Sequence, residues 1–356
     1  MENTRIESED VLISPLQLKN HLNLPEDSRD FIAKERREIE NIIQGNDNRI
    51  IVVVGPCSIH DPIAAIKYSR YLSNLKYRFS KDLLIIMRTY FSKPRTTVGW
   101  KGYVYDPDLN NSYDITKGLY SARETLLKIL SNGVSCSMEH LDTIIPQYFD
   151  DLLTWAAIGA RTTESQIHRE LASGCSIPIG FKNGTGGSID LAINAIESSN
   201  MPHNFLGCNS HGMVCKLKTL GNKNSHIILR GSNSQPNYYP EVVEDTVTKL
   251  KSKGLNDTIF IDCSHGNSQK KHKNQIRVAD IVSQQIAGGN TSIKGIMIES
   301  NLVEGNQSIN NKPLVVGQSI TDACIGLDDT YKILKTLQKA KLDRDRCLTD
   351  MVLEMV

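Results

Sequence analysis

The chain has almost no excess charge, few aromatic residues, no cysteine pairs at metal-finger spacing and no long apolar run. Its 41 Lys and Arg face 40 Asp and Glu, and aromatic residues make up 6% of its 356 residues. This balance argues against a dedicated nucleic-acid binder, and the lack of about 18 consecutive apolar residues argues against a membrane protein. Eight cysteines occur without a CxxC pair, which excludes a zinc ribbon and a disulfide-rich secreted module. With a polar, acidic N-terminus, we expect a cytoplasmic protein with reduced thiols.

Short apolar segments alternate with longer amphipathic segments from residue 51 onward, as is typical of repeated βα units. The expected strands are 51–55, 84–88, 135–139, 156–160, 178–182, 226–230, 259–263 and 295–299. The expected helices are 62–76, 117–131, 188–198, 241–253, 270–286 and 322–340. The continuously apolar strands indicate burial on both faces, and their total span is close to the roughly 250 residues of a (β/α)8 barrel. We therefore predict an α/β fold, a TIM barrel over residues 49–345, in preference to a doubly wound sheet.

Two pieces lie outside the repeat. Residues 1–48 form an N-terminal arm with helical apolar spacing in VLISPLQLKNHL and in 30–43. Residues 203–220 lie between the fifth and sixth expected strands, and their NSHGM centre predicts an inserted β-hairpin. Such additions serve assembly or regulation, or they simply cover apolar surface of the barrel.

Every expected strand delivers a charged or metal-capable side chain at its carboxyl end. In chain order these are Cys57, Arg88, Glu139, Arg161, Lys182, Arg230, His265 and Glu299. The carboxyl ends of barrel strands converge on one mouth, where barrel enzymes carry their active sites. Strand ends that merely reach solvent would explain one such residue, whereas a full set favours a functional site.

The predicted mouth is rich in cations, because the KPRTTVGWKG segment after the second strand adds Lys93, Arg95 and Lys101 to the four at strand ends. Desolvated cations repel one another unless an anionic ligand offsets their charge. Arginine and lysine both bind phosphate and carboxylate groups. The number of cations favours two small anionic substrates over one.

Cys57, His265, Glu299 and Asp322 form a second constellation. A thiolate, an imidazole and two carboxylates suit a first-row divalent metal with open coordination positions better than a closed structural zinc site. Each residue alone is ordinary, since a single cysteine is usually a small packed hydrophobe. Their shared position at one rim favours a metal site, for Mn²⁺, Fe²⁺, Co²⁺ or Zn²⁺.

Long motifs in the chain resemble one enzyme family. They are GPCSIHDP, MRTYFSKPRTTVGWKG, GARTTESQIHRELASG, GFKNGT, HIILRG, DCSHGNS, MIESNLVEGNQS and SITDACI. In this order they are similar to the type I microbial 3-deoxy-D-arabino-heptulosonate 7-phosphate (DAHP) synthases. The resemblance implies a metal-dependent transferase that condenses phosphoenolpyruvate with erythrose 4-phosphate, releases phosphate and begins the shikimate pathway to aromatic amino acids.

The resemblance also assigns roles. Phosphoenolpyruvate would be held at its phosphate by Arg161 and Arg230, and at its carboxylate by Arg88 and Lys182. Erythrose 4-phosphate would be held by Arg95 and Thr96, with Lys93 near its aldehyde. The expected metal ligands are Cys57, His265, Glu299 and Asp322, and the expected catalytic residues are Lys93, Cys57 and His265. Lys93, or a metal-bound water near Glu139, would transfer protons, and this choice stays open.

In the resembling family, an N-terminal arm and the inserted hairpin enclose an aromatic amino-acid effector between subunits. The matching residues here are Gln147, Leu171, Ser176, Phe205 and Gly207. A glycine after the Phe–Leu pair leaves room for a phenolic hydroxyl, whereas a serine goes with phenylalanine. The resemblance thus implies feedback inhibition by tyrosine in preference to phenylalanine, in a homodimer or homotetramer. An unregulated enzyme whose arm only covers apolar surface is the alternative.

Other functions fit the sequence less well. A related aldol synthase acting on arabinose 5-phosphate would lack the KPRTTVGWKG loop and the long arm. A catalytically idle barrel that senses phosphorylated sugars would not need a complete metal set. A nucleic-acid binder would carry its cations on an exposed stripe, interleaved with aromatic residues.

Overall fold

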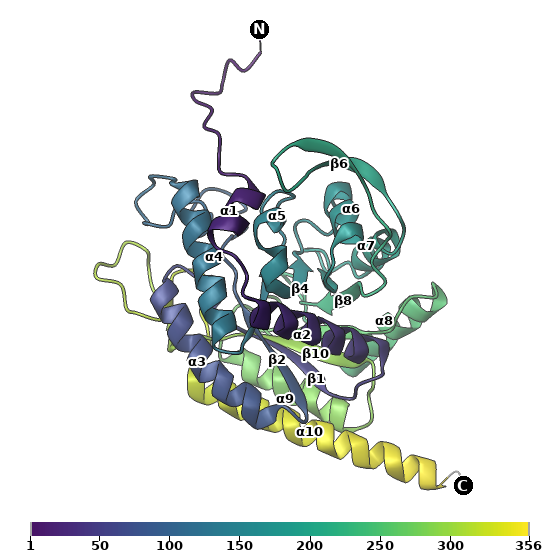
Figure 1. Cartoon of the computed structure of the whole chain (residues 1–356). Helices are drawn as coiled ribbons and strands as arrows, with labels where there is room; N and C mark the ends of the chain where they lie inside the picture. The colour runs from purple at the N-terminus through teal and green to yellow at the C-terminus, as the bar shows by residue number, and fades with distance from the viewer. Residues whose placement is uncertain (1, 355–356) are drawn as a thin grey trace.

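The computed structural model describes residues 2–354, and its centre is a closed barrel of eight parallel strands (Figure 1). The strands are β1 (Ile50–Gly55), β2 (Leu83–Arg88), β3 (Ser135–Glu139), β4 (Leu153–Ile158), β5 (Ile179–Lys182), β8 (His226–Leu229), β9 (Ile259–Asp262) and β10 (Ile293–Glu299). Strand β1 pairs with both β2 and β10, which closes the sheet. The predicted TIM barrel is therefore confirmed. Strand β4 begins three residues earlier than expected.

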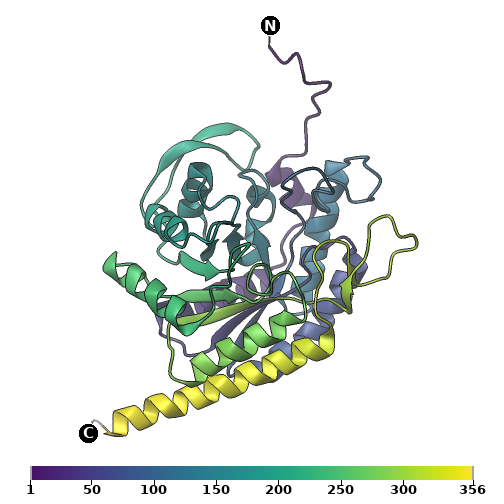
Figure 2. The same ribbon diagram turned by 180° about the vertical axis from the view of Figure 1, so that it is seen from behind.

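Helices surround the barrel (Figure 2). They are α3 (Pro62–Phe79), α4 (Ile115–Ser131), α6 (Gln166–Gly174), α7 (Asp190–Ser199), α8 (Pro240–Ser252), α9 (Asn274–Ala287) and α10 (Leu327–Glu354). Asp61 caps α3 by accepting hydrogen bonds from the Ile63 and Ala64 amides, and Pro62 occupies the first turn. No described helix combines the length and apolar character needed to cross a membrane.

Three helix expectations were wrong. The sequence analysis left 166–174 without a helix, yet α6 lies there. The helix expected over 270–286 begins at Asn274, and the one expected over 322–340 begins at Leu327. These later starts leave Lys270 and Asp322 in loops, where both line the barrel mouth.

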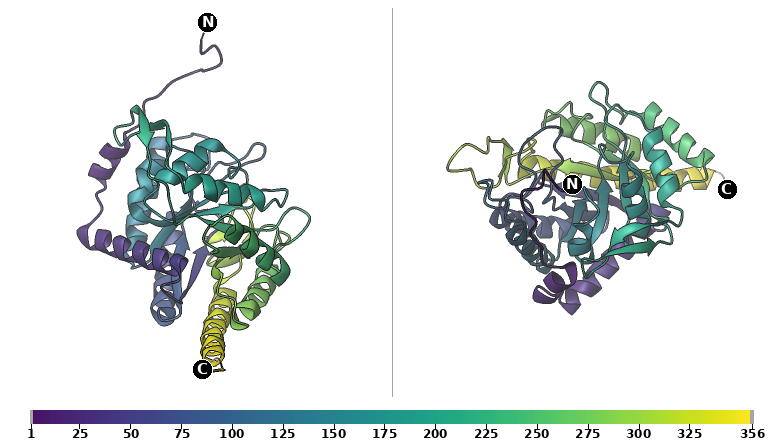
Figure 3. Two further views of the ribbon diagram at one scale, coloured as in Figure 1. Left: turned by 90° about the vertical axis from the view of Figure 1, so that its right-hand side faces the viewer. Right: turned by 90° about the horizontal axis from the view of Figure 1, so that it is seen from above.

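The N-terminal arm contains α1 (Pro15–His21) and α2 (Glu26–Gln44), while residues 2–12 run away from the barrel (Figure 3). In α2, Ile39, Ile42 and Ile43 are buried in one apolar cluster with inward-facing strand residues such as Val53 and Phe260. This spacing places the three isoleucines on one face of the helix. Helix α2 therefore closes the amino end of the barrel, leaving the carboxyl end as the open mouth.

The insertion at 203–220 forms the predicted hairpin, with β6 (Asn204–Cys208) antiparallel to β7 (Val214–Lys218). The Leu16 amide donates to the Ser210 carbonyl at 2.7 Å, so the arm touches the hairpin turn. Short elements complete the fold, namely α5 (Pro146–Phe149), η1 (Asp150–Leu152), β11 (Val303–Asn306) and β12 (Gln318–Ser319).

Candidate active site

A cavity of about 420 Å³ opens where the carboxyl ends of the barrel strands meet. Among the residues expected at the mouth, its lining includes Lys93, Arg95, Thr96, Glu139, Arg161, Lys182, Arg230, His265 and Asp322. Cys57, Arg88 and Glu299 are almost fully buried. Cys57 and Glu299 contact the lining residues Lys93 and His265, and Arg88 contacts Glu299. Lys101, which the sequence analysis counted among the mouth cations, is not part of the lining.

Arg161 and Arg230 face the cavity without a carboxylate partner among the described residues. Burial and the neighbouring Arg161 lower the pKa of Arg230, although Asp262 opposes this effect. Arg161 donates from Nε to the Thr96 hydroxyl at 3.3 Å, which joins the two groups of expected substrate residues. Unpaired cations around a hollow favour an anionic ligand.

Arg88 lies in the barrel wall with 1% of its surface exposed. Its Nη2 is 3.3 Å from Glu299 Oε1, and its guanidinium stacks over the Tyr90 ring at 4.0 Å. Its Nη1 has no hydrogen-bond partner among the described residues. A buried donor in that state is rare and can bind a substrate oxygen.

The four expected metal ligands converge, although Cys57 and Asp322 are 265 positions apart. Ligand atoms of Cys57, Glu299 and Asp322 lie within 4.8 Å of one another. His265 Nε2 is 3.8 Å from Glu299 Oε1 and completes the group. This mixture of sulfur, nitrogen and oxygen donors fits a divalent first-row metal.

Lys93 stands inside this group, with Nζ 2.7 Å from Cys57 Sγ and 3.4 Å from Asp322 Oδ2. Burial would lower the pKa of Lys93, but Cys57 and Asp322 outweigh it and raise this pKa. Burial together with Glu299 raises the pKa of the Cys57 thiol to about 12, while Lys93 brings the pKa of Asp322 to about 2. The Lys93 ammonium thus offsets the negative charges of Asp322 and Glu299.

Asp262 supports two site residues from the end of β9, a role that the sequence analysis missed. Its Oδ2 is 2.9 Å from Lys182 Nζ and 2.8 Å from His265 Nδ1, and the carboxylate is fully buried. His265 therefore presents Nε2 to the metal donors while Nδ1 faces a carboxylate. Such a pairing fixes the ring orientation and tautomer of metal-binding histidines.

Thr185, Asn233 and Lys270 also line the mouth, and the sequence analysis did not identify them. Lys270 has a backbone φ of 58° in the turn after β9. Glu139 lies against Gly159, where an added Cβ would come within 2.0 Å of Glu139 Oε1. A side chain at position 159 would therefore displace the Glu139 carboxylate from this position.

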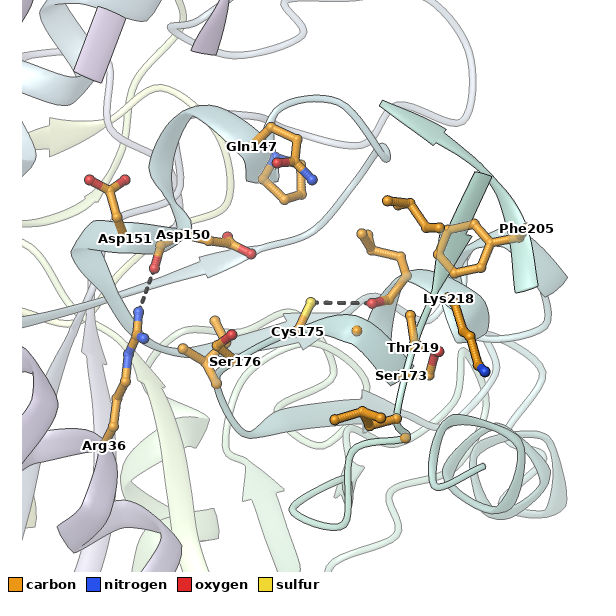
Figure 4. A pocket seen from close by; sticks show the side chains of 17 residues that line it. Arg36, Gln147, Asp150, Asp151, Ser173, Cys175, Ser176, Phe205, Lys218 and Thr219 are labelled. Atoms are coloured by element: carbon orange, nitrogen blue, oxygen red, sulfur yellow. Dashed lines mark hydrogen bonds between the residues drawn. The ribbon is translucent and has the colours of Figure 1, made fainter. Parts of the chain in front are cut away.

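A second cavity, of about 570 Å³, lies beside the hairpin and away from the mouth (Figure 4). Four of the five expected effector residues line it, namely Gln147, Leu171, Ser176 and Phe205. Gly207 does not: a Cβ there would approach Leu217 Cδ1 to 2.4 Å, and Leu217 forms part of the cavity wall. Leu217 therefore lies between position 207 and the cavity.

Comparison with known proteins places this geometry in context. The family model described as DAHP synthetase I matches residues 23–335. The chain is 49% identical to a putative phospho-2-dehydro-3-deoxyheptonate aldolase of Schizosaccharomyces pombe, covering 96% of this chain and 94% of that protein. It is 48% identical to the Phe-sensitive enzyme of Escherichia coli K12, covering 95% of this chain and 97% of that protein. It is 47% identical to the Tyr-sensitive enzyme of the same organism, covering 95% of this chain and 96% of that protein. A solved structure of this aldolase from Francisella tularensis superposes with a TM-score of 0.94 at 52% identity, covering 95% of this chain and 99% of that chain.

Proposed function

Because the chain belongs to the DAHP synthetase I family, we propose that it condenses phosphoenolpyruvate with erythrose 4-phosphate at the barrel mouth, with one divalent metal. The observation that carries the proposal is the meeting of unpaired cations and four metal-capable side chains at one cavity. The cations offset the charges of two phosphates and a carboxylate, so both anionic substrates can approach each other.

Arg161 and Arg230 bind the phosphate of phosphoenolpyruvate, while Lys182 and the free Nη1 of Arg88 bind its carboxylate. Arg95 and Thr96 bind the phosphate of erythrose 4-phosphate, which brings its aldehyde toward Lys93. The contact between Arg161 and Thr96 sets the two phosphate sites side by side. The methylene carbon of phosphoenolpyruvate can then attack the aldehyde carbon.

Cys57, His265, Glu299 and Asp322 hold the metal. When bound, a divalent cation supplies Lewis acidity toward the aldehyde oxygen and repels the neighbouring ammonium, which favours proton loss from Lys93. Lys93 donates a proton to the new alkoxide, and Glu139 accepts one from the water that adds to the carbon bearing phosphate. The bond between this carbon and the phosphate oxygen then breaks, the carbon becomes a ketone, and the remaining proton of the added water leaves with the phosphate. The proton on Glu139 passes to solvent, from which Lys93 regains the one it gave.

Phosphate release in step with phosphoenolpyruvate consumption tests this reaction. With both substrates and Mn²⁺ we expect one phosphate released for each phosphoenolpyruvate consumed. We expect no turnover after exhaustive chelation or in the Cys57→Ala variant. Binding of phosphoenolpyruvate without its consumption would instead identify a sensor barrel. Turnover that survives both chelation and Cys57→Ala would exclude the metal.

We further propose that an aromatic amino acid inhibits the enzyme from the second cavity. Phe205, Leu171 and Leu217 offer apolar walls, whereas Ser176 and Gln147 offer polar groups for the amino and carboxyl groups. Nearly equal identity to Phe-sensitive and Tyr-sensitive relatives leaves the choice of effector to the pocket. Glycine at 207 lets Leu217 retract, which favours tyrosine over phenylalanine.

Separate titrations with tyrosine, phenylalanine and tryptophan test the effector. Tyrosine should inhibit most strongly, and Gly207→Ser should shift the preference toward phenylalanine. Equal inhibition by all three amino acids would refute this reading of the pocket.

We also propose a homodimer or homotetramer, since Leu206 and Val214 of the hairpin and Val11 of the arm are exposed apolar side chains.

A further inference from the structure

A second cluster of His, Asp and Cys side chains lies outside the barrel mouth. His140 follows β3, Asp150 begins η1 and Cys175 follows α6, so three separate segments contribute one residue each. Ligand atoms of the three residues lie within 4.8 Å of one another. None of the three has a part in the proposed condensation.

The distances within this cluster suit a metal ion. His140 Nε2 is 3.0 Å from Asp150 Oδ1, and Cys175 Sγ is 3.9 Å from His140 Nδ1. In a tetrahedral zinc site, metal–ligand bonds of about 2.0 to 2.3 Å place ligand atoms roughly 3.3 to 3.7 Å apart. Because these two contacts use different ring nitrogens, the His140 ring must turn for one of its nitrogens to bind an ion together with Asp150 and Cys175.

Two atoms of the cluster lack a proper partner. His140 Nε2 and Asp150 Oδ1 are both buried, yet neither makes a hydrogen bond of good geometry among the described residues. The His140 side chain is 2% exposed. The two atoms lie 3.0 Å apart and face each other, so they form an ion pair of poor hydrogen-bond geometry that an ion held between them would replace.

The carboxylate of Asp150 has His140 as its ion-pair partner, and the two nearby arginines bind other groups. Arg36 donates from Nη2 to the Asp150 backbone carbonyl at 2.5 Å, and not to its carboxylate. The neighbouring Asp151 is bound by Arg123 at 2.7 Å. Burial opposes the shift, but Asp150 raises the pKa of His140 well above its usual value, so metal binding must release a proton from the imidazolium and one from the Cys175 thiol. The resulting imidazole, carboxylate and thiolate carry two negative charges, which one divalent cation neutralises in this low-dielectric surrounding.

The cluster lies between two cavities, since His140 and Asp150 also line a small cavity that includes Ser92 and Glu139. Asp150 and Cys175 line the cavity of about 570 Å³, where their side chains point toward each other (Figure 4). An ion can enter from this cavity, and water or another small ligand can occupy its fourth position. Sulfur and imidazole donors favour zinc over magnesium or calcium.

We propose that His140, Asp150 and Cys175 form a zinc site at the wall of the second cavity, distinct from the metal site of the barrel mouth. The proposal stands apart from the proposed reaction, because none of its ligands contacts the mouth cavity. The competing explanation is a His–Asp ion pair against which Cys175 merely packs.

Cobalt spectroscopy in a Cys57→Ala background separates these explanations. Without Cys57, any cobalt remaining at the mouth has no thiolate ligand, so a thiolate-to-cobalt charge-transfer band reports another cysteine. We expect the Cys57→Ala protein to show this band with one thiolate-bound ion per chain, and zinc to displace it. Adding Cys175→Ser or His140→Gln should remove the band, whereas Cys208→Ser, at a half-buried cysteine of the hairpin, should leave it unchanged.

Circular dichroism melts show that each variant is folded before titration. Absence of the band in Cys57→Ala, or its persistence in folded Cys57→Ala/Cys175→Ser, overturns the proposal. Neither result bears on turnover of the wild-type enzyme, which is measured separately. Failure of the zinc site and failure of the condensation are therefore distinguishable.

Discussion

Replacement of Asp262 by asparagine probes how the barrel holds its catalytic side chains. The change keeps the side-chain volume but removes the charge that lies 2.9 Å from Lys182 Nζ and 2.8 Å from His265 Nδ1. Lys182 is 4% exposed, so water cannot compensate its ammonium. Removal of one partner from a buried ion pair costs about 3 to 5 kcal/mol. We expect the melting temperature of Asp262→Asn to fall by roughly 4 to 7 °C.

The same change should affect function in two separate ways. Lys182 loses its fixed position, which should raise the KM for phosphoenolpyruvate about tenfold, the loss of one charge-assisted contact. His265 loses the carboxylate that orients its ring, which should weaken metal binding by about 10- to 100-fold. Steady-state kinetics and metal titration measure these effects, and thermal melts measure the stability.

Glu35→Gln is the matched control. Glu35 is 5% exposed and lies 2.5 Å from Lys76 Nζ and 3.0 Å from Ser135 Oγ, at the amino end of β3. This variant should lose stability to a similar extent but keep the KM and the metal affinity. Asp262→Asn with wild-type KM and metal affinity, or with a stability loss below about 1 kcal/mol, would refute the reasoning.

Three further outcomes follow from the structure. Arg95→Ala should raise the KM for erythrose 4-phosphate about tenfold or more and leave the KM for phosphoenolpyruvate unchanged. Lys101→Ala, on the same loop, is the control. An equal rise in the KM of both substrates contradicts the assignment. Burial alone would raise the pKa of Asp262, but His265 and Lys182 hold this pKa well below its usual range. The charged carboxylate therefore stabilises the folded protein fully above about pH 4, and this stabilisation is lost in more acidic solution. The stability gap between wild type and Asp262→Asn in urea unfolding should therefore narrow as pH falls below 4, and a constant gap contradicts this. Gly118→Ala should destabilise the protein by about 1 to 3 kcal/mol, because its Cβ would lie 2.1 Å from the Val104 carbonyl oxygen, and an unchanged urea midpoint would contradict it.

The sequence by itself determined the barrel and the nature of its mouth. Continuous apolar runs such as 51–55 can be stable only when buried on both faces, and parallel strands then force their carboxyl ends to one side. The charged residue at each strand end, such as Lys182 or Glu299, was therefore assignable to the mouth before any contact was known. The hairpin at 203–220 was also predicted, since turn residues between short apolar arms are a local signal.

Some local boundaries were decided by tertiary contacts. Helix α6 was missed because few of its nine residues are apolar, so its sequence shows an amphipathic pattern without a marked apolar run. The last helix begins after Asp322 because Asp322 is held beside Cys57 and Lys93 by the barrel rim. Propensity alone cannot predict such an interruption, since packing overrides it.

Only the tertiary structure decided which side chains meet across loops. Asp262 faces Lys182 and His265 because strand register sets the heights of β5 and β9, and no spacing in the sequence encodes that distance. His140, Asp150 and Cys175 meet for a similar reason, since their segments end at the same corner of the barrel. Sequence patterns record the period and burial of each element, whereas distances between loops depend on how the whole barrel closes.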